Sequence, residues 1–369
     1  MEKKRILYVG GFEMPDGNAA AQRVLAIAKT SPEDCSIEFL GLTHSDNNSG
    51  TVDGFNYKNL KYPSTKKEWL LHLAGSRELE FVTNANPDVV IAYNYPALGL
   101  WRMLHYCRKK GIKIIGDVTE WYHPHNALKW IDTEWRMKVL QKKLDGLIVI
   151  SNYLANYYAD CKIINIPPTV DLQAPIWKHD VEENKDDRIT LLYVGSPGRG
   201  EKDKLDTVVD AVQPYSNLRL KIVGINEEQY KHLYGRNEAP KNVVFAGRLS
   251  HEDAVKELKR ADFSIFFREP TRVNNAGFPT KYAEASAVGV PVITNMFSDL
   301  PKIVVQGKNG FIAENSLESI RNTIKLVAGL ARDEVDEMKQ YCKKHNEVFD
   351  YRYYKKSMAE FIGALYSEQ

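Results

Sequence analysis

One short segment, residues 268–284, combines a helix start with the side chains that bind a diphosphate. Gly277 lets the backbone approach a ligand closely, and Pro279 and Thr280 are typical of the first turn of a helix. Such a helix directs its free N–H groups and the positive end of its dipole toward a bound anion. Lys281 in the first turn adds a positive charge that a diphosphate would compensate. The segment therefore predicts an anion site.

Glu284 follows Lys281 by about one turn, on the same face of the predicted helix. A carboxylate at this place could accept hydrogen bonds from the two hydroxyls of a ribose. Lys281 and Glu284 together predict a site for a nucleotide diphosphate. A capped surface helix with a Lys–Glu pair fits the same residues and is the alternative.

A second set of cations lies in residues 195–203, GSPGRGEKD, between an apolar run and a helix-length segment. The loop begins at Gly195, and Arg199 and Lys202 supply two positive charges. This arrangement suits a diphosphate clamp, and we expect all three residues to bind the donor. For Arg199 and the neighbouring Lys204, a solvated charged loop is the alternative.

Acidic, imidazole and aromatic side chains gather in residues 117–125, DVTEWYHPH, at the end of another apolar run. Rings stack on the faces of sugars and carboxylates bind their hydroxyls, so the cluster suits sugar recognition. Asp117, Glu120 and His123 are the candidate catalytic residues. The same side chains could hold a metal, but their spacing matches no known ligand helix. His125 fits a structural turn.

Short apolar runs alternate with helix-length segments along the chain, which is typical of parallel sheets built from βαβ units and predicts an α/β fold. The polar stretch 177–188 resembles an interdomain linker. Because ILYVGG and LLYVGS open the two halves alike, we expect two Rossmann-like domains, residues 1–172 and 173–369, with the last helix able to pack back on the first domain. The predicted strands are 5–9, 36–40, 89–92, 113–117, 146–150, 162–166, 189–194, 218–223, 242–246, 263–267 and 290–294, and the predicted helices are 19–29, 65–81, 97–110, 126–144, 202–212, 227–234, 251–260, 280–288 and 317–330.

Composition excludes several classes of protein. Fifty basic and forty-eight acidic residues give a net charge of +2, which argues against a general nucleic-acid binder. The four cysteines form no CxxC pair, as expected for a reduced cytosolic chain without structural zinc. With neither a signal-peptide core nor a long apolar run, we expect a cytoplasmic protein that could touch only the inner face of the membrane. The lack of an Asp-x-Asp pair favours a metal-independent site in which cations and a helix N-terminus neutralise a leaving diphosphate.

Residues 274–315, NNAGFPTKYAEASAVGVPVITNMFSDLPKIVVQGKNGFIAEN, resemble the nucleotide-sugar-binding segment of the family-four retaining glycosyltransferases with the GT-B fold. That family has two glutamates eight positions apart. Glu284 matches the second, whereas Ala276 stands in place of the first. The resemblance implies that Glu284 holds the ribose and that Asn274 or Asn275 takes over the contact to the donor sugar. The A-G-F-P-T-K variant resembles a subgroup that makes surface polysaccharides.

The rest of the chain resembles this family more loosely. The resemblance implies that Arg199 and Lys202 form the basic pair on the donor diphosphate and that Gly11 and Gly17 lie in a loop closing over it. For Gly17 a plain strand-to-helix turn is the alternative. Residues 117–125 would line the acceptor side of a cleft between two facing domains. The resemblance also implies retention without an enzyme nucleophile, the departing phosphate helping to deprotonate the acceptor.

The function that follows is a retaining, metal-independent, hexosyltransferase-type glycosyltransferase. It would move a sugar from a nucleotide-diphosphate sugar, a UDP-sugar in preference to a GDP-sugar, to an acceptor sugar or lipid-linked glycan. The setting would be capsular, exopolysaccharide or lipopolysaccharide synthesis, and no separate cofactor is expected. The alternatives are a nucleotide-sugar epimerase of the same fold and a two-domain sugar-nucleotide-binding protein without catalysis.

The predicted helix 126–144 carries more apolar surface than one core-facing stripe needs, together with several lysines. With the basic residues at 109, 110 and 113, it could rest the first domain on an anionic leaflet. Lys138, Lys142 and Lys143 would supply much of the charge. The alternative is that its tryptophans belong to the core and its lysines form a solvated face.

Overall fold

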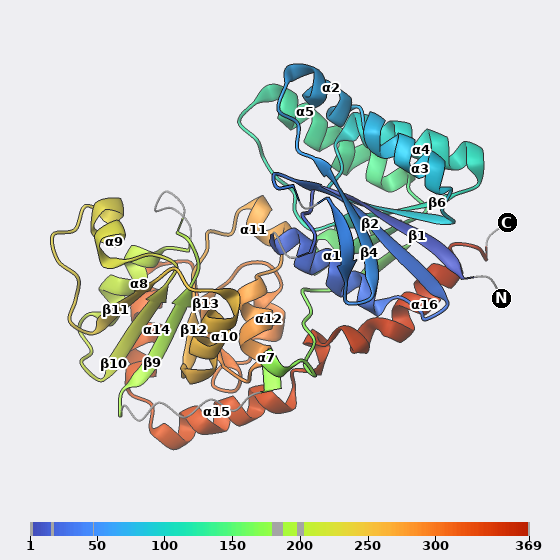
Figure 1. Ribbon diagram of the computed structural model, residues 1–369. Coiled ribbons are helices and arrows are strands. Elements are labelled where there is room, and N and C mark those ends of the chain that lie inside the picture. The colour runs from blue at the N-terminus through green and yellow to red at the C-terminus, as the bar shows by residue number, and fades with distance from the viewer. Residues whose placement is uncertain (1–2, 16–17, 47, 179–186, 198–202, 368–369) are drawn as a thin grey trace. The chain divides into compact units, whose positions relative to one another are not determined.

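The computed structural model describes residues 3–367, apart from 16–17, 47, 179–186 and 198–202. It divides into two compact units (Figure 1). The first unit contains Met1–Thr169 and Tyr351–Gln369, and the second contains Val170–Asp350. The first division falls three residues before the predicted boundary at 172, and the C-terminal segment returns to the first unit. Most of the predicted linker 177–188 lies outside the described residues.

The first unit is built on an eight-stranded sheet in the order β3-β4-β2-β1-β5-β6-β7-β8, parallel except where β3 pairs with β4. The central strands are almost entirely buried because helices cover both faces. The edge strand β3 and its neighbour β4 were not predicted, since their residues are mainly polar or alternate in burial. The strands are β1 Lys4–Gly10, β2 Cys35–Thr43, β3 Ser49–Val52, β4 Phe55–Lys61, β5 Val89–Tyr93, β6 Lys113–Val118, β7 Gly146–Val149 and β8 Ile163–Asn165.

Helices α1 and α16 pack on one face of this sheet, and α3 and α4 pack on the other (Figure 1). The predicted helix 65–81 is two helices, because Gly75 between them has a φ of +61°. The predicted helix 126–144 begins as α5 and continues as a π-helix, Arg136–Leu140, and a 3-10 turn, Gln141–Lys143. The α-helices are α1 Ala19–Thr30, α2 Lys66–Leu73, α3 Ser76–Ala85, α4 Ala97–Lys110, α5 Ala127–Trp135, α6 Asn152–Tyr157 and α16 Lys355–Ala364.

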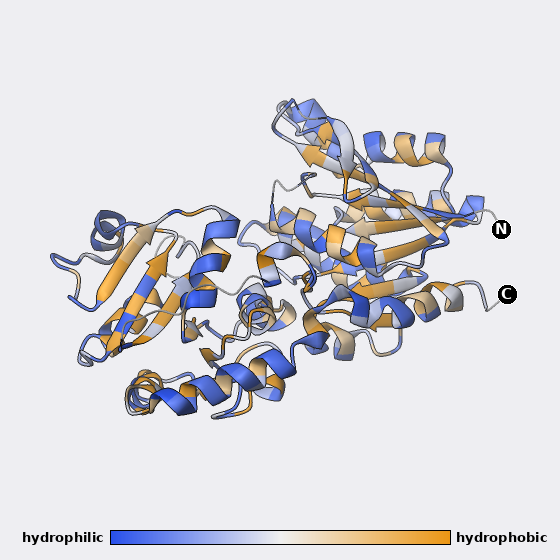
Figure 2. Cartoon of the chain, turned by 60° about the horizontal axis from the view of Figure 1, so that its bottom comes forward, coloured by the Kyte–Doolittle hydropathy of each residue, from blue (hydrophilic) through white to orange (hydrophobic). Residues whose placement is uncertain are grey.

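The second unit is built on a fully parallel six-stranded sheet in the order β11-β10-β9-β12-β13-β14. The strands are β9 Ile189–Val194, β10 Leu218–Val223, β11 Val243–Gly247, β12 Phe263–Ile265, β13 Val292–Asn295 and β14 Gly310–Ala313. Figure 2 shows mainly hydrophobic strands and helices with a hydrophilic side, which agrees with a buried sheet.

Nine α-helices of the second unit lie within its described residues. Those that contribute to one core are α8, α9, α14 and α15, and α10, α12 and α13 contribute to the other. Their bounds are α7 Pro175–Lys178, α8 Leu205–Val212, α9 Glu227–Tyr234, α10 His251–Arg260, α11 Arg272–Ala276, α12 Thr280–Ala287, α13 Leu300–Ile303, α14 Leu317–Ala328 and α15 Arg332–Lys344.

Both sheets reverse their strand order beside the first strand of the unit. In the first unit, β2 and β5 flank β1, and in the second, β10 and β12 flank β9. Ligands of open α/β sheets bind beyond the carboxyl ends of the strands at such a switch point. Two edges of the molecule are therefore candidate sites.

Within the described stretches of the chain, no helix has both the length and the apolar character needed to cross a membrane.

Candidate functional site

At the switch point of the second sheet, short contacts link the ends of four strands in two pairs. A Cβ at Gly224 would lie 2.1 Å from the backbone oxygen of Gly195, so the turns after β9 and β10 touch backbone to backbone. The Asn295 side chain, at the end of β13, accepts a hydrogen bond from the Arg268 N–H at 2.8 Å and donates one to the Arg268 carbonyl at 2.7 Å. Arg268 is thereby fixed just beyond β12.

A buried carboxylate organises the cations at this edge. Asp203, 1% exposed, accepts hydrogen bonds from Arg268 Nε at 2.6 Å, Lys281 Nζ at 2.5 Å and the Tyr193 hydroxyl at 3.0 Å. Burial alone would raise the pKa of the Asp203 carboxyl, but Lys281 and Arg268 outweigh burial and lower this pKa to about 2. The Lys281 ammonium also lies 4.2 Å from the centroid of the Tyr193 ring.

These contacts give the edge a definite charge. One carboxylate faces two cations, so that the cluster of described residues carries one net positive charge. The adjacent Lys204 and Glu269 form a pair at 2.6 Å and cancel each other. An edge of this kind attracts an anion, and it does so with cations whose positions are already set.

Lys281 was expected to face a diphosphate directly. Its Nζ is instead bonded to Asp203, and its side chain is only 14% exposed. The structure therefore shows how this charge is held, and its role toward a diphosphate stays a prediction. Three other predicted donor residues, Arg199, Lys202 and Gly17, lie outside the described residues.

The start of α12 supplies the second feature of the site. Pro279 precedes the helix and is buried, while Thr280 at its first position is exposed. Glu284 stays partly accessible, with its Oε1 3.7 Å from Nε2 of His251 at the start of α10. The first-turn N–H groups and Glu284 thus belong to one helix end, as expected for a phosphate and a ribose bound side by side.

The segment before α12 is braced by its own polar groups. Asn275 donates to the carbonyl of Pro270 at 3.1 Å and accepts from the N–H of Ser298 at 2.9 Å, and the Ser298 hydroxyl donates to the carbonyl of Gly277 at 2.6 Å. Asn274 donates to the carbonyl of Glu269 at 2.8 Å. Both asparagine amides, expected at the donor sugar, are engaged in holding this turn.

Ala276, which occupies the place of the family's first glutamate, is fully buried. A glutamate there would place a charge in the core without solvent, so alanine suits the backbone as it stands.

At the corresponding edge of the first sheet, a Cβ at Gly10 would lie 2.4 Å from the carbonyl oxygen of Tyr93, whereas Gly11 is exposed and has open space around it. Asp117 is 0% exposed and is bonded to the Tyr8 hydroxyl at 2.5 Å and to Arg23 Nη2 at 3.2 Å. A carboxylate enclosed in this way braces the sheet, and the predicted catalytic role of Asp117 stays a prediction.

Glu120 and His123 remain accessible at the first sheet's edge. The Glu120 carboxylate accepts a hydrogen bond from the Tyr122 hydroxyl, and burial together with Glu120 raises the pKa of Tyr122 far above its usual range. His123 and His125 are exposed. No group of three His, Cys, Asp or Glu side chains is placed to hold a metal ion among the residues that the structure describes.

Sequence reasoning missed three members of these clusters: Asp203, Arg268 and His251. Arg268 could have been found, since it follows a predicted strand at the carboxyl edge where ligands bind. Asp203 was inside the basic loop already considered, but its partners lie 65 and 78 positions away. No local pattern marks such a pairing.

Comparisons with known proteins show which proteins this chain resembles. Residues 176–347 match the family model of the glycosyl transferases group 1. A GDP-mannose-dependent monoacylated alpha-(1-6)-phosphatidylinositol monomannoside mannosyltransferase of Corynebacterium glutamicum is 27% identical over 125 residues, which are 32% of this chain and 32% of that protein. The aligned part therefore spans less than half of either protein.

Solved structures resemble the whole chain. Sucrose-phosphate synthase from Thermosynechococcus elongatus is 15% identical, with a TM-score of 0.71 and full coverage of both chains. HepE from Anabaena, in complex with UDP and glucose, is 14% identical, with a TM-score of 0.69 over 98% of this chain and 100% of that chain. The predicted α/β fold with two Rossmann-like domains, the GT-B fold, is confirmed by this likeness. The match to the family model of the glycosyl transferases group 1 covers nearly all of the second unit.

Proposed function

We propose that this protein transfers a hexose from a nucleotide-diphosphate sugar, preferably a UDP-sugar, to an acceptor with retention of configuration and without a metal ion. The observation that carries the proposal is the Asp203–Arg268–Lys281 cluster beside the start of α12 and Glu284. A net positive charge, a helix N-terminus and a carboxylate suited to a ribose are the parts that a nucleotide diphosphate requires.

The chemistry asked of these residues is to stabilise the leaving group. Negative charge grows on the diphosphate as the bond to the sugar breaks, so cations fixed in advance stabilise the transition state more than the bound donor. Arg268 and Lys281 are already fixed by Asp203 and need little reorganisation. No enzyme nucleophile is invoked, and the departing phosphate helps to deprotonate the acceptor hydroxyl.

For the acceptor we propose a sugar or lipid-linked glycan, as in the synthesis of a surface polysaccharide, handled at the cytoplasmic face of the membrane. Glu120 and His123 are the accessible polar groups at the first sheet's edge and would contact it. The Corynebacterium relative is named for transfer to a phosphatidylinositol mannoside, a lipid-borne glycan. That relative supports an acceptor of similar kind here.

The test is to incubate the full chain with UDP-glucose, UDP-galactose and GDP-mannose and to measure release of the free nucleotide. A transferase releases UDP or GDP, slowly by hydrolysis and faster when an acceptor glycan is added. Conversion of one sugar nucleotide into another without release would identify an epimerase instead. Binding without either change would identify a non-catalytic binding protein.

The matched variants are Glu284→Ala and Glu337→Ala. Glu337 lies on α15 and is exposed. Release should be lost in the first variant and retained in the second. Equal activity of the two variants would remove Glu284 from the site.

A further inference from the structure

Helix α2 is unusual because it buries none of its residues against the rest of the protein. None of its eight residues is buried, and all eight are described. A surface helix of a globular protein normally buries one apolar stripe. Here Leu70 is 68% exposed, and Trp69 and Leu73 are also exposed. The helix is nevertheless well defined, because Thr65 and Glu68 form a capping box at its start.

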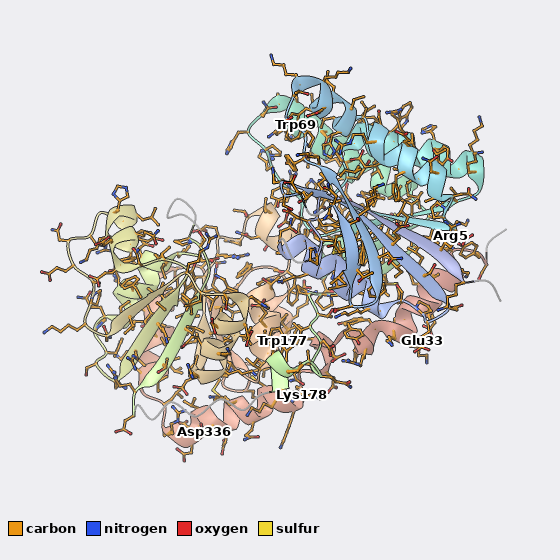
Figure 3. All side chains as sticks on the ribbon, in the orientation of Figure 1. Arg5, Glu33, Trp69, Trp177, Lys178 and Asp336 are labelled. Atoms are coloured by element: carbon orange, nitrogen blue, oxygen red, sulfur yellow. The ribbon has the colours of Figure 1, made fainter. Side chains whose placement is uncertain are left out.

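The apolar surface continues from α2 onto α4. Arg102 of α4 donates to the carbonyl of Ala74 at 2.6 Å and bonds to the Ser76 hydroxyl at 2.8 Å, which fixes α4 against the end of α2. On the outer side of α4, Leu98 and Trp101 are exposed. Figure 3 places the labelled Trp69 on α2.

From α4 the surface reaches α5. The Ala97 N–H, at the start of α4, donates to the Asp132 carboxylate at 2.8 Å. One residue before Asp132, Ile131 is exposed, and Leu128 is 77% exposed. We call this surface the three-helix face and define it by its exposed apolar residues Leu70, Leu73, Leu98, Trp101, Leu128 and Ile131. Exposed leucine and tryptophan side chains on three contacting helices are typical of an interaction surface.

The charged groups around the three-helix face identify its partner. Lys66 and Lys67 at the start of α2 and Lys129 on α5 are exposed. Two acids lie nearby: Glu68 accepts from the backbone of Ser64 and Thr65, and Asp132 accepts from Ala97. Three lysines against two carboxylates leave this rim with one net positive charge, and it surrounds leucine and tryptophan side chains.

We infer that the three-helix face docks on an anionic lipid surface. Leucine and tryptophan enter the boundary between headgroups and acyl chains, while lysines keep their ammonium groups among the anionic headgroups. This inference rests on exposure and charge alone. It deepens the proposed function, because an acceptor carried on a lipid would be met where the protein docks.

The face differs from the membrane surface predicted from sequence. Arg136, Met137 and Leu140 of the predicted helix 126–144 are buried, so its second half exposes less apolar surface than its first turns. Lys138 is paired with Glu134 at 2.8 Å, and Lys142 lies over the ring of Tyr157. The apolar residues of α2 and α4 take the place of that half of the helix.

The experiment is co-sedimentation of the full chain with vesicles of phosphatidylcholine alone and of phosphatidylcholine with phosphatidylglycerol. The docking variant is Leu70→Glu with Leu128→Glu, and the matched control is Leu317→Glu with Leu326→Glu, two leucines that are also exposed, on α14 of the second unit. Wild type and control should bind the anionic vesicles, and 0.5 M salt should weaken binding (about 4 Å screening length). The docking variant should bind at least about tenfold more weakly by the loss of buried apolar area.

A third variant, Lys66→Glu with Lys67→Glu, separates charge from apolar insertion and should lose binding mainly at low salt. Wild type that stays in the supernatant with anionic vesicles at low salt overturns the inference. So does a docking variant that binds as tightly as wild type, or a concentration-dependent dimer that the docking variant abolishes. Nucleotide release from a soluble donor should be the same in all variants, so failure here leaves the proposed function standing.

Discussion

Each sheet has a buried aspartate at its switch-point edge, and the two aspartates differ in the number of cations that they face. Asp203 faces two cations, Arg268 and Lys281, and leaves a net positive cluster among described residues. Asp117 faces one cation, Arg23, and the cluster is neutral.

The remaining hydrogen bonds of the two arginines differ as well. Arg23 Nη1 donates to the carbonyls of Ile166 and Pro167 at 2.6 and 3.0 Å, so the arginine ties chain segments together. Arg268 is held by Asp203 and by the backbone contacts of Asn295. The same architecture thus holds a neutral brace in one unit and a net positive cluster in the other.

The largest effect should come from breaking the brace. Changing Arg23 to Met leaves Asp117 buried without its cation and should lower the free energy of unfolding by roughly 3–5 kcal/mol. Urea unfolding followed by circular dichroism measures this, with Arg321→Met on the exposed side of α14 as the control. The nucleotide affinity of the folded variant should be unchanged. If affinity falls along with stability, the two edges do not have separate roles.

Next in size is the loss of the ribose contact. Glu284→Ala should weaken UDP binding by roughly 2–4 kcal/mol, because hydrogen bonds from two hydroxyls to a charged acceptor are removed. Isothermal titration calorimetry with UDP measures the loss, and the melting temperature should stay that of wild type. An affinity within about twofold of wild type (about 0.4 kcal/mol) would show that the ribose lies elsewhere.

A smaller effect is expected from Lys281→Met, and it should appear in turnover. Since the charge that Lys281 faces grows as the diphosphate leaves, turnover should fall by about a hundredfold, while uridine binding should change little. The test is to measure kcat and the affinity for uridine in Lys281→Met and Lys281→Arg, and to compare the loss in each quantity relative to wild type. If turnover and uridine affinity fall by the same factor, the role of Lys281 is only to support the fold of the site.

The pH dependence of stability distinguishes the two aspartates further. The Asp203 pKa of about 2 in the folded protein lies below the ordinary pKa of an aspartate, so the folded state favours the charged form. Its contribution, about 2 kcal/mol, is present above pH 4 and is lost as the pH falls toward 2. Asp203→Asn should therefore flatten the fall in unfolding free energy between pH 4 and pH 2.5, measured in urea. An unchanged slope would place the depressed pKa on another group.

The smallest expected effect is that of a chelator. If cations and the helix N-terminus neutralise the leaving diphosphate, EDTA should leave nucleotide release unchanged. Release is measured before and after dialysis against EDTA, and then with added Mg²⁺ or Mn²⁺. Collapse on chelation with recovery on adding metal would replace the proposed chemistry with a metal-bridged one.

Sequence patterns predicted the strands that form the centre of each sheet, because strands buried on both faces are continuous apolar runs. They missed β4, whose FNYKNLK alternates between buried and exposed positions beside the edge strand β3. They also joined α2 to α3, since the left-handed backbone of Gly75 cannot be distinguished from an ordinary helical glycine by periodicity.

The site was predictable only in part, for a physical reason. The start of α12 is local, and so Pro279, Lys281 and Glu284 were found together. Asp117 was assigned to catalysis because its neighbours in sequence are polar, whereas its actual partners, Tyr8 and Arg23, lie 109 and 94 positions away. Long-range pairing decides whether a carboxylate reacts or braces, and single-sequence patterns do not contain it.

The return of the last nineteen residues to the first unit has a consequence for synthesis on the ribosome. The second unit is complete once Asp350 has emerged, but the first still lacks Met358, Phe361 and Ile362 of α16, which are part of its core. The first unit is therefore translated first, but its core is completed last. Until α16 has emerged from the ribosome, part of its apolar interior stays open to water and to chaperones.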